Sequence, residues 1–201
     1  MSYPPPPWKM HGQLWFSLFC VREGDHTERE PGVYGAALAS YQPPSPLIYS
    51  ELLVARSVKA ARGRRVNITD IWVDSADSRD GGWQLWAIPK ELCRFERATT
   101  GKRVQRTSWY ITLDGKRVAS ARFTDVSSNT LRTPFKASTW QQRPAADSGT
   151  DREVVAELTG TAKVLPCRGS WDFDEQGPLA WMAGKRTLAS FRMADFQMSF
   201  G

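Results

Sequence analysis

Helical structure gives way to extended structure within one short segment, Gly82-Trp83-Gln84-Leu85-Trp86-Ala87-Ile88-Pro89-Lys90-Glu91-Leu92. Pro89 fixes its own φ angle and disfavours helical geometry at Ile88. A helix that begins at Ser75, a good N-cap residue, must therefore end before Pro89. Lys90 then starts a new extended segment directly after an apolar, tryptophan-rich stretch.

Lys90 is the residue of this segment with the clearest chemical potential. A lysine held in apolar surroundings is costly as a cation and shifts toward the neutral amine, the form that attacks carbonyl carbons. The alternative is an ordinary surface lysine with its ammonium group in water. Glu51 is a second candidate because it lies inside the otherwise apolar run from Leu47 to Val58. A solvent-facing carboxylate is the commoner arrangement on a strand, so the position of Glu51 stays open at this point.

The rest of the chain reads as β-structure punctuated by turns. Asp114-Gly115 between two apolar runs is a strong hairpin signal. About nine strands and one or two short helices in 201 residues predict one mainly β domain, residues 1–201, with a proline-rich arm at residues 1–7. The expected architecture is a closed β-barrel or a sandwich. The expected strands are Leu14–Val21, Gly32–Tyr41, Leu47–Val58, Val66–Val73, Arg103–Leu113, Arg117–Phe123, Phe135–Trp140, Val154–Leu165 and Leu188–Phe200.

Composition argues against several classes of site. Cys20, Cys93 and Cys167 are widely separated, and the histidines are His11 and His26, so the sequence assembles no zinc site or Ser-His-Asp triad. We expect no metal and no cofactor. There is no apolar run long enough for a transmembrane helix and no signal peptide, which predicts a cytoplasmic protein without membrane contact.

The net charge of +6 raises the question of nucleic acid. The cations are clustered in Arg62-Gly63-Arg64-Arg65, which reads as a turn between two strands, and are otherwise dispersed among acids. Nucleic-acid binders usually carry a basic stripe with a recognisable motif. The excess charge is therefore interpreted as surface charge, and the expected partner is a small molecule.

Four motifs in order resemble the acetoacetate decarboxylase family across nearly the whole chain: Pro7-Trp8-Lys9-Met10-His11, Tyr49-Ser50-Glu51, Asp70-Ile71-Trp72-Val73-Asp74 and the segment from Gly82 to Leu92. Pro89-Lys90 looks like the start of the family's Pro-Lys-Lys motif, whose first lysine forms a Schiff base. Glu51 matches the family's active-site glutamate. The resemblance implies a cone-shaped, mostly antiparallel β-barrel that encloses the site, and a homo-oligomer.

Several polar positions depart from the family pattern. The second lysine of the motif is Glu91, and the family's Gly-Arg-Glu is Gly82-Trp83-Gln84. The arginine that the family places near its first motif is Gln13, and a second acid is missing from the strand that contains Gly35 and Ala36. If Glu91 met Lys90, it would raise the pKa of the lysine, whereas burial would lower it. Adjacent residues on a strand point to opposite faces, which favours burial of Lys90 alone.

Replacing an arginine by Trp83 exchanges an anion-binding group for an apolar surface. We therefore expect catalytic residues Lys90 and Glu51 in an aromatic pocket, with substrate bound by Trp83, Trp86, Gln13, Tyr49, Gln84 and Trp72. Three functions remain open. The first is an enzyme of secondary metabolism that cyclises, isomerises or rearranges a bulky apolar, polyketide-like carbonyl or enol compound. The second is a Schiff-base decarboxylase or an aldolase/dehydratase of a keto acid, and the third is a non-catalytic ligand-binding barrel.

Overall fold

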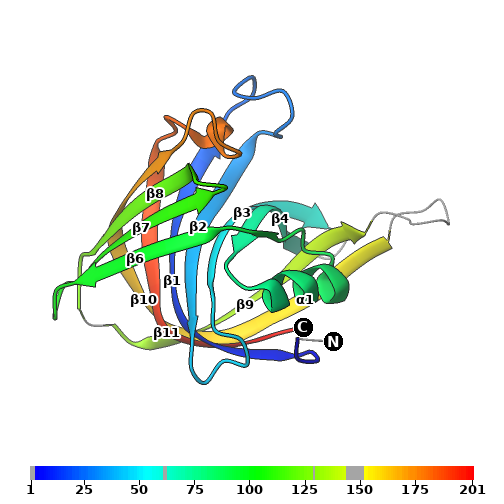
Figure 1. Cartoon of the computed structure of the whole chain (residues 1–201), viewed down its shortest axis with the longest axis horizontal. Helices are drawn as coiled ribbons and strands as arrows, with labels where there is room; N and C mark the ends of the chain where they lie inside the picture. Colours follow the sequence, from blue (N-terminus) through cyan, green and yellow to red (C-terminus); the bar gives the residue numbers. More distant parts are fainter. Residues whose placement is uncertain (1–2, 61–62, 129, 144–151) are drawn as a thin grey trace.

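A computed structural model describes residues 3–60, 63–128, 130–143 and 152–201 (Figure 1). Within these residues the fold is mainly β, with eleven strands, one α-helix and one 3-10 turn. The elements are β1 Trp8–Val21, β2 Gly32–Gln42, β3 Ser50–Ala60, β4 Gly63–Val73, α1 Ala76–Trp86, β5 Glu91–Leu92, β6 Arg94–Thr100, β7 Arg106–Leu113, β8 Lys116–Asp125, β9 Arg132–Arg143, β10 Arg152–Phe173, η1 Ala180–Met182 and β11 Thr187–Phe200.

Seven strands close into a ring in the order β11-β1-β2-β3-β4-β9-β10, and β10 returns to β11. The ring is antiparallel except where β4 meets β9 in parallel at a single residue pair, Val66 and Thr139. β10 is long enough to leave the ring: its first part pairs with β9 and β11, and its last part pairs with β8. Strands β8, β7 and β6 therefore form a flap beside the ring, as Figure 1 shows on its left side.

Two hydrophobic cores lie on opposite faces of β1, β2 and β3, because successive side chains of a strand point to opposite faces. One core lies between these strands and the β6–β8 flap, and it includes Trp15, Phe19, Leu52, Trp72 and Trp109. The other core fills the inside of the ring, and it includes Met10, Tyr41, Ile71, Trp86 and Phe196. The second core is the one that α1 covers.

Helix α1 begins and ends as the sequence predicts. The Ser75 side chain accepts a hydrogen bond from the backbone N–H of Ser78 at 3.2 Å, which is a standard N-cap arrangement. The helix ends at Trp86, three residues before Pro89. Near its C-terminal end it contacts the N-terminal arm, where the Tyr3 hydroxyl donates to the Gln84 side chain at 2.5 Å.

The sequence underestimates the amount of strand. Eleven strands are present in the described residues instead of about nine, β1 begins at Trp8 instead of Leu14, and β10 runs to Phe173. The closed ring agrees with the expected barrel, and the strands outside it form the flap, in which β6 pairs with β7 alone among the described residues. Residues 1–2 of the predicted N-terminal arm and Arg62 of the predicted basic cluster lie outside the described residues. No helix in the described part of the chain has the length and apolar character needed to cross a membrane.

Candidate active site

A tight turn after α1 carries Lys90 into the ring. Ala87 adopts the left-handed conformation (φ 54°), and the N–H of Ile88 donates back to the Gly82 carbonyl at 3.0 Å. Across Pro89, the N–H of Lys90 donates to the Ile88 carbonyl at 2.8 Å, a three-residue turn that suits the fixed φ of proline. The turn directs the Lys90 side chain inward and leaves the next residue, Glu91, exposed on β5.

Three side chains surround the Lys90 ammonium group. Its Nζ lies 2.9 Å from a carboxylate oxygen of Glu51, 2.9 Å from the hydroxyl of Ser78 and 3.4 Å from the hydroxyl of Tyr49. The other carboxylate oxygen of Glu51 accepts a hydrogen bond from the Tyr41 hydroxyl at 3.1 Å. The side chains of Lys90 and Glu51 are each only 5% exposed, so this is a buried ion pair with its hydrogen-bonding capacity largely used.

The pair borders an apolar cavity of about 320 Å³. This volume is at the low end of the ~300–1,000 Å³ range of small-molecule sites. Large apolar side chains supply most of the lining: Trp8, Met10, Ile71, Trp86, Ile88, Phe135, Met193, Phe196, Met198 and Phe200. Lys136 also borders the cavity, but its side chain is 70% exposed and binds Glu157 at 2.9 Å. Because Phe135 and Ala137 flank Lys136 on β9 and point inward, its ammonium group points outward.

Electrostatics keep Lys90 protonated when the cavity holds no ligand. Desolvation lowers the pKa of Lys90, but the charge and hydrogen bonds of Glu51, together with those of Tyr49, outweigh burial and leave this pKa raised. Burial raises the pKa of Tyr49 to about 12, and burial next to Glu51 raises the pKa of Tyr41 well above its usual value. Both tyrosines are therefore neutral at physiological pH, and each can donate a hydrogen bond.

One face of α1 is shaped around the lysine. Ser78, Gly82 and Trp86 are spaced by four residues and so share a side of the helix. Ser78 binds the Lys90 ammonium group, and Trp86 lines the cavity. A Cβ atom placed on Gly82 would lie 2.8 Å from Cδ of Lys90, so the absence of a side chain there makes room for the lysine stem.

Four of the expected site residues line this cavity: Lys90, Glu51, Tyr49 and Trp86. The predicted proximity of Lys90 to Glu51 is confirmed by their 2.9 Å contact. Among the described residues, the ion-pair partner of Lys90 is Glu51 and not Glu91, which is exposed on β5.

The other four expected substrate-binding residues do not line this cavity. Trp83 is 47% exposed, because it lies one residue beyond the cavity-facing side of α1, and its indole N–H donates to the Lys90 carbonyl at 2.8 Å. Gln84 is exposed for the same reason. Trp72 is buried in the core beneath the flap, because strand alternation turns it away from Ile71. Gln13 lies within the register shift between Gly12 and Leu14 of β1 and borders a different cavity.

Tyr41 and Ser78 are polar residues of the site that sequence reasoning missed. Ser78 could have been found from its spacing to Gly82 and Trp86, which repeats every four residues. Tyr41 reaches Glu51 only because β2 and β3 pair in a register that places Ala39 opposite Glu51. No local pattern specifies that register. In the described residues, no group of three or more His, Cys, Asp or Glu side chains is arranged to hold a metal ion.

Known structures share this fold at low sequence identity. The enduracididine biosynthesis enzyme MppR, in complex with pyruvate, is 18% identical to this chain with a TM-score of 0.77. The superposition covers 99% of this chain and 90% of the MppR chain. An acetoacetate decarboxylase-like enzyme from Sphingomonas wittichii RW1 is 12% identical, with a TM-score of 0.74 and coverage of 98% and 91%. Acetoacetate decarboxylase from Legionella pneumophila is 13% identical, with a TM-score of 0.68 and coverage of 100% and 86%.

Sequence comparison identifies the family. Curated proteins show no sequence match to this chain. The family model described as acetoacetate decarboxylase matches residues 27–183, which include β2 through η1 and therefore both Glu51 and Lys90. This match spans well over half of the sequence. The chain belongs to the acetoacetate decarboxylase family.

Proposed function

We propose that this protein is an enzyme that forms an imine between Lys90 and a neutral, apolar carbonyl compound, and that it cyclises, isomerises or rearranges the bound chain. The observation that carries the proposal is the contact between the Lys90 ammonium group and Glu51 beside an apolar cavity. A buried pair of this kind supplies a nucleophile and a proton acceptor within hydrogen-bond reach of each other.

The chemistry begins with a proton transfer inside the pair. When a ligand displaces water from the cavity, Glu51 takes a proton from the Lys90 ammonium group and leaves a free amine. The amine nitrogen attacks the carbonyl carbon, and the C=O π electrons move to oxygen. Glu51 returns this proton to that oxygen, then takes a proton from the attached nitrogen and delivers it to the same oxygen, which departs as water and leaves the protonated imine. Loss of a proton from the neighbouring carbon then gives an enamine, the carbon nucleophile needed for cyclisation or isomerisation.

The lining supports an uncharged substrate. Lys90 is the cation that points into the cavity, and its charge is already balanced by Glu51. Among the described residues no arginine borders this cavity, so a substrate carboxylate would lack a guanidinium partner. Methionine is well suited to irregular apolar ligands because its side chain is flexible and polarisable, and Met10, Met193 and Met198 all line the cavity.

Two ligands that differ by one carboxylate test the substrate class. 3-Oxooctanoate is 2-heptanone with a carboxylate added to its methyl carbon, and in calorimetric titrations we expect tighter binding of the neutral ketone. The matched variant is Trp86→Leu, which shrinks the apolar wall and should weaken the ketone more than the keto acid. Tighter binding of the keto acid would contradict the proposal for an uncharged substrate.

A conventional keto-acid reaction is the second candidate, and one observation favours it. MppR, which shares the fold, binds pyruvate in one known structure. Decarboxylation or aldol chemistry on a keto acid would use the same Lys90 imine but would release carbon dioxide or join two substrates. Carbon dioxide release from acetoacetate, measured in wild type and in Lys90→Met, separates this candidate from the first. If neither ligand class forms an adduct with Lys90 and neither is converted to product, the non-catalytic ligand-binding barrel is the function that remains.

The homo-oligomer implied by the family resemblance remains a prediction, which light scattering of the purified protein tests.

A further inference from the structure

A second cavity lies behind the first, on the other face of β11. Alternation along this strand places Met193 at the Lys90 cavity and its neighbours Arg192 and Ala194 at the second one. The second cavity has a volume of about 640 Å³ and is bordered by β1, β10, β11, the β2–β3 connection and the β6–β7 connection. It shares no lining residue with the Lys90 cavity. We call it the basic cleft.

The rim of the basic cleft carries uncompensated positive charge. Lys102 and Arg103 come from the connection between β6 and β7, and Lys163 comes from β10. None of these three cations forms an ion pair with another residue that the structure describes. The two carboxylates at the cleft are already engaged, since Asp125 binds Arg192 and Asp195 binds Arg132. The cleft therefore has a positive balance that no neighbouring acid neutralises.

The floor of the cleft offers hydrogen-bonding groups without partners. Arg192 is 6% exposed, and its Nη1 donates to Asp125 at 2.5 Å. Its buried Nε makes no hydrogen bond to any described residue, and no described residue accepts one from Nη2. The side-chain oxygen of Gln13 is also buried without a partner in the described part of the chain. Buried polar groups are normally satisfied, so these groups beside the cavity remain free to hydrogen-bond a bound molecule.

We propose that the basic cleft binds a small polyanion of the phosphate-ester class. A guanidinium group on the floor and three cations on the rim surround one hollow, which matches the several oxygens and multiple charges of a phosphate ester. Gln42, Gln105 and Gln197 add amide groups that can hydrogen-bond the polar body of such a ligand. The four cations border one hollow and come from three parts of the fold, the β6–β7 connection, β10 and β11, and they do not form the extended stripe that a nucleic-acid backbone needs.

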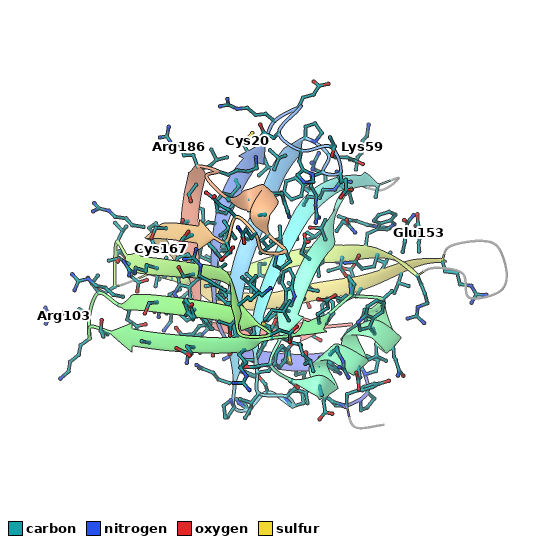
Figure 2. The ribbon with its side chains drawn as sticks, turned by 45° about the horizontal axis from the view of Figure 1, so that its top comes forward. Cys20, Lys59, Arg103, Glu153, Cys167 and Arg186 are labelled. Atoms are coloured by element: carbon teal, nitrogen blue, oxygen red, sulfur yellow. The ribbon has the colours of Figure 1, made fainter. Side chains whose placement is uncertain are left out.

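Calorimetric titration with pyrophosphate tests the cleft directly. We expect saturable binding of one pyrophosphate per chain. The double variant Arg103→Gln/Lys163→Gln should weaken binding about tenfold or more, because two charge-assisted contacts are lost. The matched control is Lys59→Gln/Arg186→Gln, which changes the net charge equally at sites away from the cleft. Figure 2 shows Arg103 at the left edge of the molecule, with Lys59 and Arg186 toward the top. The control should change the affinity less than about twofold.

Two outcomes would overturn the proposal. One is the absence of saturable binding by wild type, and the other is an equal loss of affinity in both double variants, which would show non-specific attraction. Citrate titrated in parallel distinguishes phosphate from carboxylate, and tighter binding of citrate would refute the assignment to phosphate esters. Lys90→Met should bind pyrophosphate as wild type does, so the result is independent of the proposed imine chemistry.

Discussion

The Lys90–Glu51 and Arg192–Asp125 ion pairs are buried to similar extents but sit in different surroundings. Lys90 faces an apolar cavity, and Arg192 faces a polar cleft on the other side of β11. Arginine does not lose its proton in proteins, whereas lysine does so when its environment changes. Burial of an ion pair is therefore no sign of catalysis by itself. What distinguishes Lys90 is its apolar cavity and, in the proposed function, a proton that moves to Glu51.

The largest expected effect comes from exchanging the two cations. Lys90→Arg keeps the positive charge but removes the one amine that, among the described residues, points into the cavity, so we expect no detectable imine adduct. Arg192→Lys, the matched exchange in the other pair, should leave adduct formation at the wild-type level. Mass spectrometry after reduction measures both. An adduct of normal yield in Lys90→Arg would show that the reaction occurs elsewhere.

The second prediction concerns stability. Arg192→Met leaves Asp125 buried without its counter-charge, and breaking such a pair typically costs about 3–5 kcal/mol of unfolding free energy. Arg192→Met/Asp125→Leu removes both charges and should recover most of that loss, because buried pairs can often be replaced by apolar residues. Urea unfolding of the three proteins measures the difference. A double variant as unstable as Arg192→Met would mean that the pair has a further structural role.

The apolar lining is the other half of the contrast, and two neighbouring tryptophans test it. Trp86→Ala removes an aromatic wall of the Lys90 cavity and should weaken binding of an apolar ketone by about ten- to a hundredfold, from the ~1.5–3 kcal/mol of a buried side chain. Trp83→Ala removes a tryptophan outside the cavity and should change the affinity far less. Calorimetric titration of 2-heptanone measures both. An equal loss of affinity in both variants would mean that Trp83 also binds the substrate, as the sequence predicted.

The pH dependence gives the smallest effect and reports on the pair itself. The pKa of Lys90 lies above its ordinary value of 10.5, so the stabilisation by this pair is present below pH 10.5 and is lost as pH rises through the folded-state pKa. In Glu51→Gln the main cause of the increase is gone and burial remains, so the pKa falls. The pH profile of imine trapping should then shift to lower pH, with a smaller maximum because the proton acceptor is missing. Asp125→Asn should leave the profile unchanged, and a shift there would contradict the separation of the two pairs.

Local patterns predicted much of this molecule. The Ser75 cap and Pro89 located α1 and the start of the Lys90 segment, and the Asp114-Gly115 turn located the hairpin of β7 and β8. Capping groups and proline act over a few residues, so the sequence alone reveals their effects. The resemblance to a known family then supplied the pairing of Lys90 with Glu51.

Features that depend on phase and register were harder to predict. Trp83 and Trp86 look equivalent in the sequence, but the rotation of α1 places one outside and the other in the cavity. Gln13 lies in the basic cleft because the pairing of β1 with β11 shifts between Gly12 and Leu14. A shift in register changes the face that a side chain occupies, and it is set by contacts between distant strands.

The central claim is that Lys90 acts as a nucleophile toward carbonyl compounds. The most direct measurement is reduction of wild-type protein with sodium borohydride in the presence of 2-heptanone, followed by peptide mass mapping. We predict a single adduct with the mass of the reduced ketone on the peptide that contains Lys90, and none on that peptide in Lys90→Met. Absence of an adduct at Lys90 with both 2-heptanone and acetoacetate, under conditions in which the ligand is shown to bind, would contradict the claim.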